Sequence, residues 1–138
     1  GSAMAQIYNH MIMPLATREQ KETQAYWAVR DFEHRFGRFP EGMWLPETAV
    51  DVETLEVLAA LDLKFTILAP HQAKRRRRIG DKDWISIAER GLDTRKAYLA
   101  KLPSGRSIAL FFYDSHISRG VAFERLLDSG DNFARRLM

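Results

Sequence analysis

Carboxylate, imidazole and aromatic side chains gather in this sequence directly after the short apolar segments that predict β-strands. Four such groups are Tyr8, Asn9 and His10; Trp44 and Glu47; Pro70, His71 and Gln72; and Tyr113, Asp114, Ser115 and His116. In parallel α/β sheets and barrels the carboxyl ends of the strands meet at one edge, where ligands bind. We therefore expect these groups to form one rim. Aromatic faces stack on sugar rings and a carboxylate pair can act on an acetal carbon, so the rim indicates a sugar site.

The elements that must position this rim alternate between strand and helix. Strands are predicted at residues 5–10, 43–45 and 63–69, a hairpin at 98–102 and 107–113, and helices after Thr17, after Asp51, near Ser118 and beyond Ser129-Gly130. Thr17 and Gln20 have the spacing of a capping box, and Asp51 is a suitable N-cap. This order predicts an α/β fold in which mostly parallel strands alternate with helices, plus one hairpin.

The apolar residues of these elements predict where the core lies. The first helix carries an apolar stripe that includes Phe32 and Phe36, with Trp27 beside it, and Gly37 ends the helix. We expect these three aromatic side chains to be core residues. Residues 108–113 are apolar throughout, which is typical of a strand covered on both faces.

Three segments carry recognisable motifs: Tyr8 to Leu15, Phe36 to Ala49, and Phe111 to Asp114 followed by Ile117-Ser118. The first resembles a Tyr-x-His-x-Ile/Leu-x-Pro-Leu motif, and the second, through Trp44 and Glu47, a Gly-x-Trp-x-x-Glu region. The third resembles a segment that bears a second catalytic carboxylate. These are motifs of glycoside hydrolase family 57, in the branch of α-amylases and α-mannosidases. The chain lacks a His-x-His-Gln-Pro segment, so we expect an internal fragment of that family's catalytic barrel.

The resemblance implies part of a (β/α)7 barrel and a retaining hydrolase or glucanotransferase that acts on α-linked glucans. Glu47 would be the nucleophile and Asp114 the acid/base residue, about 5–5.5 Å apart. The side chains expected to bind the sugar are Tyr8, His10, Trp44, His71 and His116. No cofactor or metal is implied.

Each of these residues also has a structural interpretation. Glu47 can cap the helix that follows, and Asp114 can be a turn residue at the end of a strand. His10 can form a structural hydrogen bond, and His71 and His116 can be ordinary loop histidines. The sequence leaves these alternatives open.

Length and composition narrow the classes of protein. With 138 residues, of which 46% are hydrophobic, the chain is expected to be one folded domain, with residues 71–97 as an excursion loop. A complete barrel needs about 250 residues. The chain has no cysteine, which excludes disulfides and thiolate metal sites. We see no apolar run of about 18 residues and no secretory leader, so we expect a cytoplasmic protein without a membrane partner.

Charge gives little indication of a polyanionic partner. The net charge is +3, and the run Lys74 to Arg78 fits the pattern of a nucleic-acid patch. Because no second basic stripe accompanies it, we expect a solvated loop and no nucleic acid. The histidines lack His-x-His or His-x3-His spacing, which disfavours a metal site.

Two other functions remain open. One is a metal-dependent polysaccharide deacetylase or α-mannosidase-like enzyme on a related barrel, and the other is a non-catalytic carbohydrate-binding module. Open strand edges invite association, so we also expect a homo-oligomer.

Overall fold

The computed structural model describes residues 2–138, which form two compact units. The first unit comprises the described residues through Leu68 together with Ala97–Phe111, and the second comprises Ala69–Lys96 and Phe112–Met138. None of the described helices combines the length and apolarity needed to cross a bilayer.

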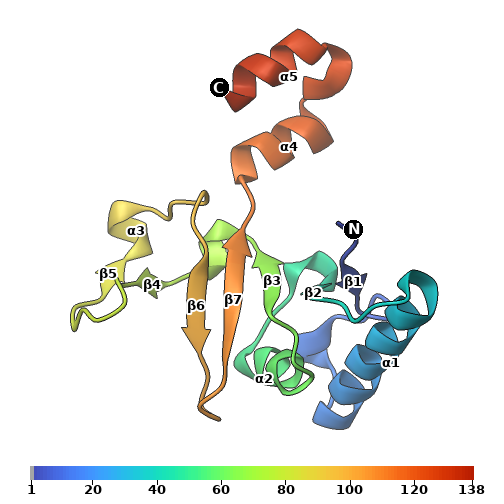
Figure 1. Cartoon of the computed structure of the whole chain (residues 1–138). Helices are drawn as coiled ribbons and strands as arrows, with labels where there is room; N and C mark the ends of the chain where they lie inside the picture. The colour runs from blue at the N-terminus through green and yellow to red at the C-terminus, as the bar shows by residue number, and fades with distance from the viewer. Residues whose placement is uncertain (1) are drawn as a thin grey trace. The chain divides into compact units, whose positions relative to one another are not determined.

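A five-stranded sheet is the centre of the first unit (Figure 1). Its strands, in spatial order, are β1 (Ala5–Gln6), β2 (Gly42–Trp44), β3 (Phe65–Leu68), β7 (Ser107–Phe112) and β6 (Tyr98–Lys101). β1, β2 and β3 are parallel neighbours, with Ala5 opposite Met43 and Gly42 opposite Phe65. β6 and β7 form an antiparallel hairpin. Three consecutive strands without a reversal of order are typical of a barrel wall, whereas a doubly wound sheet reverses.

Two helices make the crossovers between the parallel strands. Helix α1 (Arg18–Phe36) joins β1 to β2, and α2 (Val52–Ala60) joins β2 to β3. The predicted capping box is present, because Gln20 N donates to Thr17 Oγ1 and Thr17 N donates to Gln20 Oε1. Helix α1 ends at Gly37, whose φ of 64° suits a residue without a Cβ. These elements confirm the predicted α/β fold with mostly parallel strands and one hairpin.

The core of the first unit lies along the sheet. Its fully buried apolar side chains include Ile7, Met43, Leu45, Leu58 and Ile108. The buried Thr66 hydroxyl donates to the carbonyl of Met43 at 2.8 Å, so the strand-pairing residues satisfy their polar groups internally.

Gly42 lies directly beneath the aromatic ring of Phe65. A Cβ at this position would overlap Cζ and both Cε atoms of that ring. The close approach of β2 to the ring therefore requires glycine at position 42.

Two expectations about buried aromatic residues are wrong. Of the three aromatic residues expected in the core from α1, Phe32 is buried, at 3% exposure, whereas Trp27 is 46% and Phe36 is 53% exposed. β1 is two residues long and lies at the edge of the sheet, so it leaves this part of the helix surface open. On β7, Phe111 is also exposed, because the ring of Phe65 contacts it only edge on.

The second unit contains short elements. Residues 71–97 include a two-residue antiparallel pair, β4 (Arg75–Arg76) with β5 (Ile85–Ser86), followed by α3 (Ile87–Arg90). The helices α4 (Ser115–Phe123) and α5 (Gly130–Leu137) follow β7, where helices are predicted. The 3₁₀ turn Leu126–Asp128 lies between them.

Candidate functional site

His10 and Glu47 meet at the carboxyl ends of β1 and β2. Nε2 of His10 lies 3.4 Å from Oε1 of Glu47, and Nδ1 of the same ring lies 3.3 Å from the amide nitrogen of Gln6. Both side chains are open to solvent, His10 at 57% and Glu47 at 75% exposure. Oε2 of Glu47 makes no hydrogen bond within the described chain. This oxygen is therefore free to approach a ligand.

The backbone at this site adopts an uncommon conformation. His10, Glu47 and Thr48 have φ values of 52°, 55° and 52°, in the left-handed region that non-glycine residues rarely occupy. Pro46 and Thr48 are buried on either side of the exposed Glu47. Backbone strain of this kind gathers at functional sites, where the surrounding structure holds it.

The structure excludes the alternative in which Glu47 caps the helix that follows. Glu47 lies in the 3₁₀ turn Pro46–Thr48, and Asp51 is the N-cap of α2. Oδ1 of Asp51 accepts a hydrogen bond from Thr54 N at 2.7 Å. The Glu47 carboxylate therefore has no part in starting the helix.

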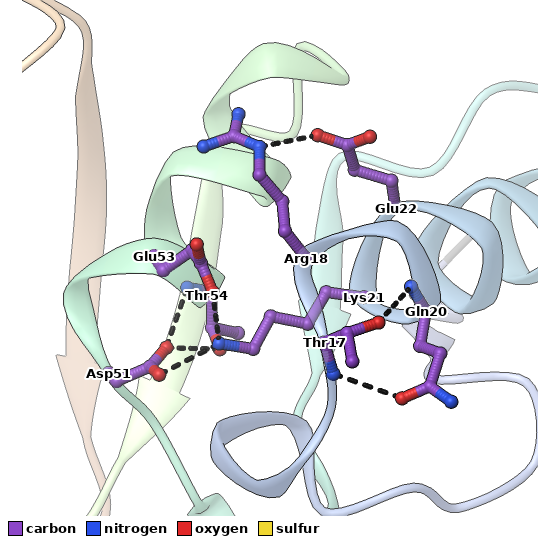
Figure 2. Close-up of polar contacts among 8 residues, drawn as sticks. All are labelled: Thr17, Arg18, Gln20, Lys21, Glu22, Asp51, Glu53 and Thr54. Carbon is purple, nitrogen blue, oxygen red and sulfur yellow. Dashed lines mark hydrogen bonds and ion pairs between the residues drawn. The ribbon is translucent and has the colours of Figure 1, made fainter.

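A buried lysine fixes the start of α2 immediately after this turn (Figure 2). Lys21, on α1, is 2% exposed, and its Nζ donates to Asp51 Oδ2 at 2.8 Å and to Glu53 Oε2 at 2.7 Å. Burial alone would lower the pKa of Lys21, but the hydrogen bonds to these two carboxylates outweigh it and raise the pKa. Burial likewise would raise the pKa of Asp51, and the hydrogen bonds from Lys21 and Thr54 lower it instead.

Gln24, one turn further along α1, holds the turn that carries His10. Its buried side-chain oxygen accepts a hydrogen bond from Asn9 N at 2.9 Å. Neither Lys21 nor Gln24 is among the site residues predicted from the sequence. The available signal was their place on the helix face that also carries the buried Ala25, Ala28 and Phe32.

Two aromatic residues of the predicted rim lie at the surface of the first unit. Tyr8 is half exposed and meets the ring of Trp27 edge on at 5.7 Å, and Trp44, the last residue of β2, is half buried. An open groove of about 480 Å³ borders Tyr8 between β1 and α1. Its lining within the described chain does not include His10, Trp44 or Glu47, so the groove is separate from the carboxylate.

The other predicted rim residues belong to the second unit. Asp114 is the N-cap of α4, and its Oδ1 accepts hydrogen bonds from the backbone of His116 and Ile117, each at 2.9 Å. His116 and His71 are exposed, and His71 lies in the 3₁₀ turn Pro70–Gln72. Oδ1 of Asp114 therefore has a structural role in capping α4, as the alternative interpretation of a residue at the end of a strand implies. No cluster of three or more potential metal ligands occurs among residues 2–138.

Solved structures with a similar fold act on carbohydrates, according to their descriptions. An exo-type maltose-forming amylase from Pyrococcus sp. ST04 is 21% identical, with a TM-score of 0.65 over 89% of this chain and 19% of its own length. A 4-α-glucanotransferase from Thermococcus litoralis is 16% identical, with a TM-score of 0.62 over 91% of this chain and 18% of its own. A protein described as a polysaccharide deacetylase from Mycobacterium smegmatis is 12% identical, with a TM-score of 0.58 over 83% and 32%.

These likenesses establish the fold, and the chain spans about a fifth to a third of the length of the structures that it matches. No curated protein sequence matches it. The family model described as glycosyl hydrolase family 57, however, matches residues 2–138, which is almost the whole chain. This match shows that the chain belongs to glycosyl hydrolase family 57.

Proposed function

We propose that this chain carries the catalytic carboxylates of a retaining glycoside hydrolase or glucanotransferase that acts on α-linked glucans. The observation that carries the proposal is the position of Glu47. It lies in the 3₁₀ turn that follows the parallel strand β2, is 75% exposed, has a left-handed backbone conformation and is hydrogen-bonded through one oxygen to His10. Membership of glycosyl hydrolase family 57 supplies the reaction class.

In this proposal Glu47 attacks the anomeric carbon and forms a glycosyl-enzyme intermediate. Asp114 first protonates the leaving oxygen and then removes a proton from the acceptor, which is water in hydrolysis or a sugar hydroxyl in transfer. His10 binds Oε1 of Glu47 and leaves Oε2 to attack. Tyr8, Trp44, His71 and His116 would contact the sugar rings.

The remainder of the catalytic site would come from outside this chain. Because the similar structures are three to five times longer, we propose that further barrel elements, or a second copy of the chain, cover the open edge of β1. If a second copy covers this edge, the molar mass measured by light scattering should be that of a dimer or a larger assembly.

Covalent trapping tests the role of Glu47 directly. The chain is incubated with 5-fluoro-α-glucosyl fluoride, whose fluoride leaves without an acid, and is digested for mass spectrometry. We expect the fluorosugar on the peptide that contains Glu47, on the wild type and on Asp114→Asn, but not on Glu47→Gln. A label on a different carboxylate contradicts the proposal.

The same experiment separates the alternatives. A carbohydrate-binding module would bind maltooligosaccharides and remain unlabelled. A deacetylase would remain unlabelled and contain a stoichiometric divalent metal by elemental analysis.

A further inference from the structure

The positive charge of this protein is concentrated in one segment of the second unit, residues 74–86, which we call the basic hairpin. It contains six basic residues, Lys74, Arg75, Arg76, Arg77, Arg78 and Lys82, against Asp81 and Asp83. Its net charge is therefore +4, whereas that of the whole chain is +3. The rest of the chain thus carries a net charge of −1.

The structure orders this segment, which the sequence predicts to be a solvated loop. Arg75 pairs with Ser86 and Arg76 with Ile85 across β4 and β5. Arg75 and Arg77 lie two residues apart, and each guanidinium carbon lies 4.7 Å from the centre of the Trp84 ring. Such contacts hold a guanidinium against the ring and leave N–H groups at its edge for a ligand.

No carboxylate in the described chain neutralises Lys74 to Arg78. The polar contacts of this run are to backbone carbonyls, from Arg76 to Gly91 and from Arg77 to Asp81. Nine basic residues elsewhere pair with carboxylates, namely Arg18, Lys21, Arg30, Arg35, Lys64, Arg95, Lys96, Arg119 and Arg125. The basic hairpin therefore presents uncompensated and mutually repelling charges, which a bound anion would stabilise.

We propose that the basic hairpin binds the phosphate esters of a phosphorylated α-glucan, a substrate class that rests on the proposed function. The planar guanidinium donates two parallel hydrogen bonds to phosphate oxygens, and the guanidinium groups of Arg75 and Arg77 both pack on the ring of Trp84. A phosphate monoester is compact and carries a charge of about −1.5 to −2, which matches a short positive segment.

The same observations argue against nucleic acid as the ligand. A single strand stacks its bases on successive aromatic faces, whereas the basic hairpin has one aromatic residue, Trp84, on whose ring Arg75 and Arg77 already pack. Nucleic acid also needs a basic footprint that follows many phosphates. Outside the basic hairpin this chain has a net negative charge.

Affinity electrophoresis of the full chain tests the proposal, with phosphorylated amylopectin and the same polymer after phosphatase treatment. We expect the phosphorylated polymer to bind at least about tenfold more tightly, because charged hydrogen bonds of this kind are each worth about that factor. The double variant Arg75→Gln/Arg77→Gln should lose this preference. The control Arg135→Gln/Arg136→Gln removes the same charge from α5 and should keep it.

The other outcomes distinguish a failure of the phosphate site from a failure of the proposed function. Equal binding of both polymers overturns the phosphate site but leaves glucan binding, and hence the proposed function, intact. A phosphate preference without a fluorosugar label on Glu47 leaves the phosphate site standing and overturns the proposed function. Competition by glucose 6-phosphate at equal phosphate concentration would assign the site to small sugar phosphates, and stronger competition by single-stranded DNA would assign it to nucleic acid.

A second variant covers the case in which the glutamine variant does not fold. Arg75→Lys/Arg77→Lys keeps the charge but removes the planar fork, so the phosphate preference should fall by several-fold. An unchanged preference in this folded variant contradicts bidentate binding by Arg75 and Arg77.

Discussion

His10 and Glu47 share a hydrogen bond although 37 residues separate them in the chain. The side-chain amide nitrogen of Gln6 lies 3.3 Å from Nδ1 of His10, and Nε2 of the same ring lies 3.4 Å from Oε1 of Glu47. This geometry fixes which carboxylate oxygen is occupied and which remains open.

Replacing Gln24 with methionine should loosen the turn that carries His10. The backbone N–H of Asn9 would lose its acceptor, and the free energy of unfolding should fall by about 1–2 kcal/mol. Hydrogen exchange by NMR should show the Asn9 amide exchanging at least about tenfold faster, with the buried Val57 of α2 as internal control. Unchanged exchange at Asn9 would show that Gln24 does not hold this turn.

Replacing Lys21 with methionine should destabilise the protein by about 1–3 kcal/mol in urea denaturation. Asp51 and Glu53 would then lack their shared cation, and because both are partly exposed the loss is smaller than for a fully buried pair. The matched control is Arg18→Met, which breaks the exposed pair with Glu22 and should cost less than about 1 kcal/mol. Equal losses in the two variants would contradict a special role for Lys21.

The Lys21–Asp51 pair should make stability depend on acid pH. The folded-state pKa of Asp51 is lowered, so its contribution is present above the unfolded pKa of about 3.9 and is lost as pH falls through the folded value. Asparagine also caps helices, so Asp51→Asn isolates the charge. Urea midpoints should differ between wild type and variant at pH 6, and the difference should shrink steadily as the pH falls below the unfolded pKa. A constant difference over this range argues against the ion pair.

Replacing Gly42 with alanine should destabilise the first unit by about 1–3 kcal/mol, because the new methyl group would overlap the ring of Phe65. The double variant Gly42→Ala/Phe65→Leu should recover part of the loss. Gly130→Ala is the control, since no atom lies within 4 Å of its added Cβ. Thermal unfolding measures all three, and additive effects at positions 42 and 65 would contradict the contact.

Asp114 can be tested for catalysis separately from its capping role. Asp114→Asn keeps an N-cap for α4, whereas Asp114→Ala should weaken the helix by about 1 kcal/mol. The asparagine variant should still lose about 10²–10⁴-fold in the rate of glucan cleavage, because it cannot donate a proton. It should retain reaction with an α-glucosyl fluoride. If the asparagine variant cleaves glucan at the wild-type rate, Asp114 has only its structural role.

The helix boundaries of the first unit could be predicted because local sequence signals mark them. The capping box at Thr17, the N-cap at Asp51 and the glycine after Phe36 each depend on neighbours within four residues, and the structure confirms the helices that they delimit. The exposure of Trp27 and Phe36 was not predictable in this way. Helical periodicity shows which face is apolar, but it does not show whether another element covers that face.

The alternation of strands and helices, the family and the candidate residues follow from the sequence, because short-range spacing and motifs carry that information. Tertiary packing buries Lys21 against two carboxylates, brings His10 to Glu47, and places Arg75 and Arg77 against the ring of Trp84. The first two contacts join residues far apart in the chain, and the third depends on the pairing of β4 with β5. Their geometry follows from how strands and helices pack, which no local pattern encodes.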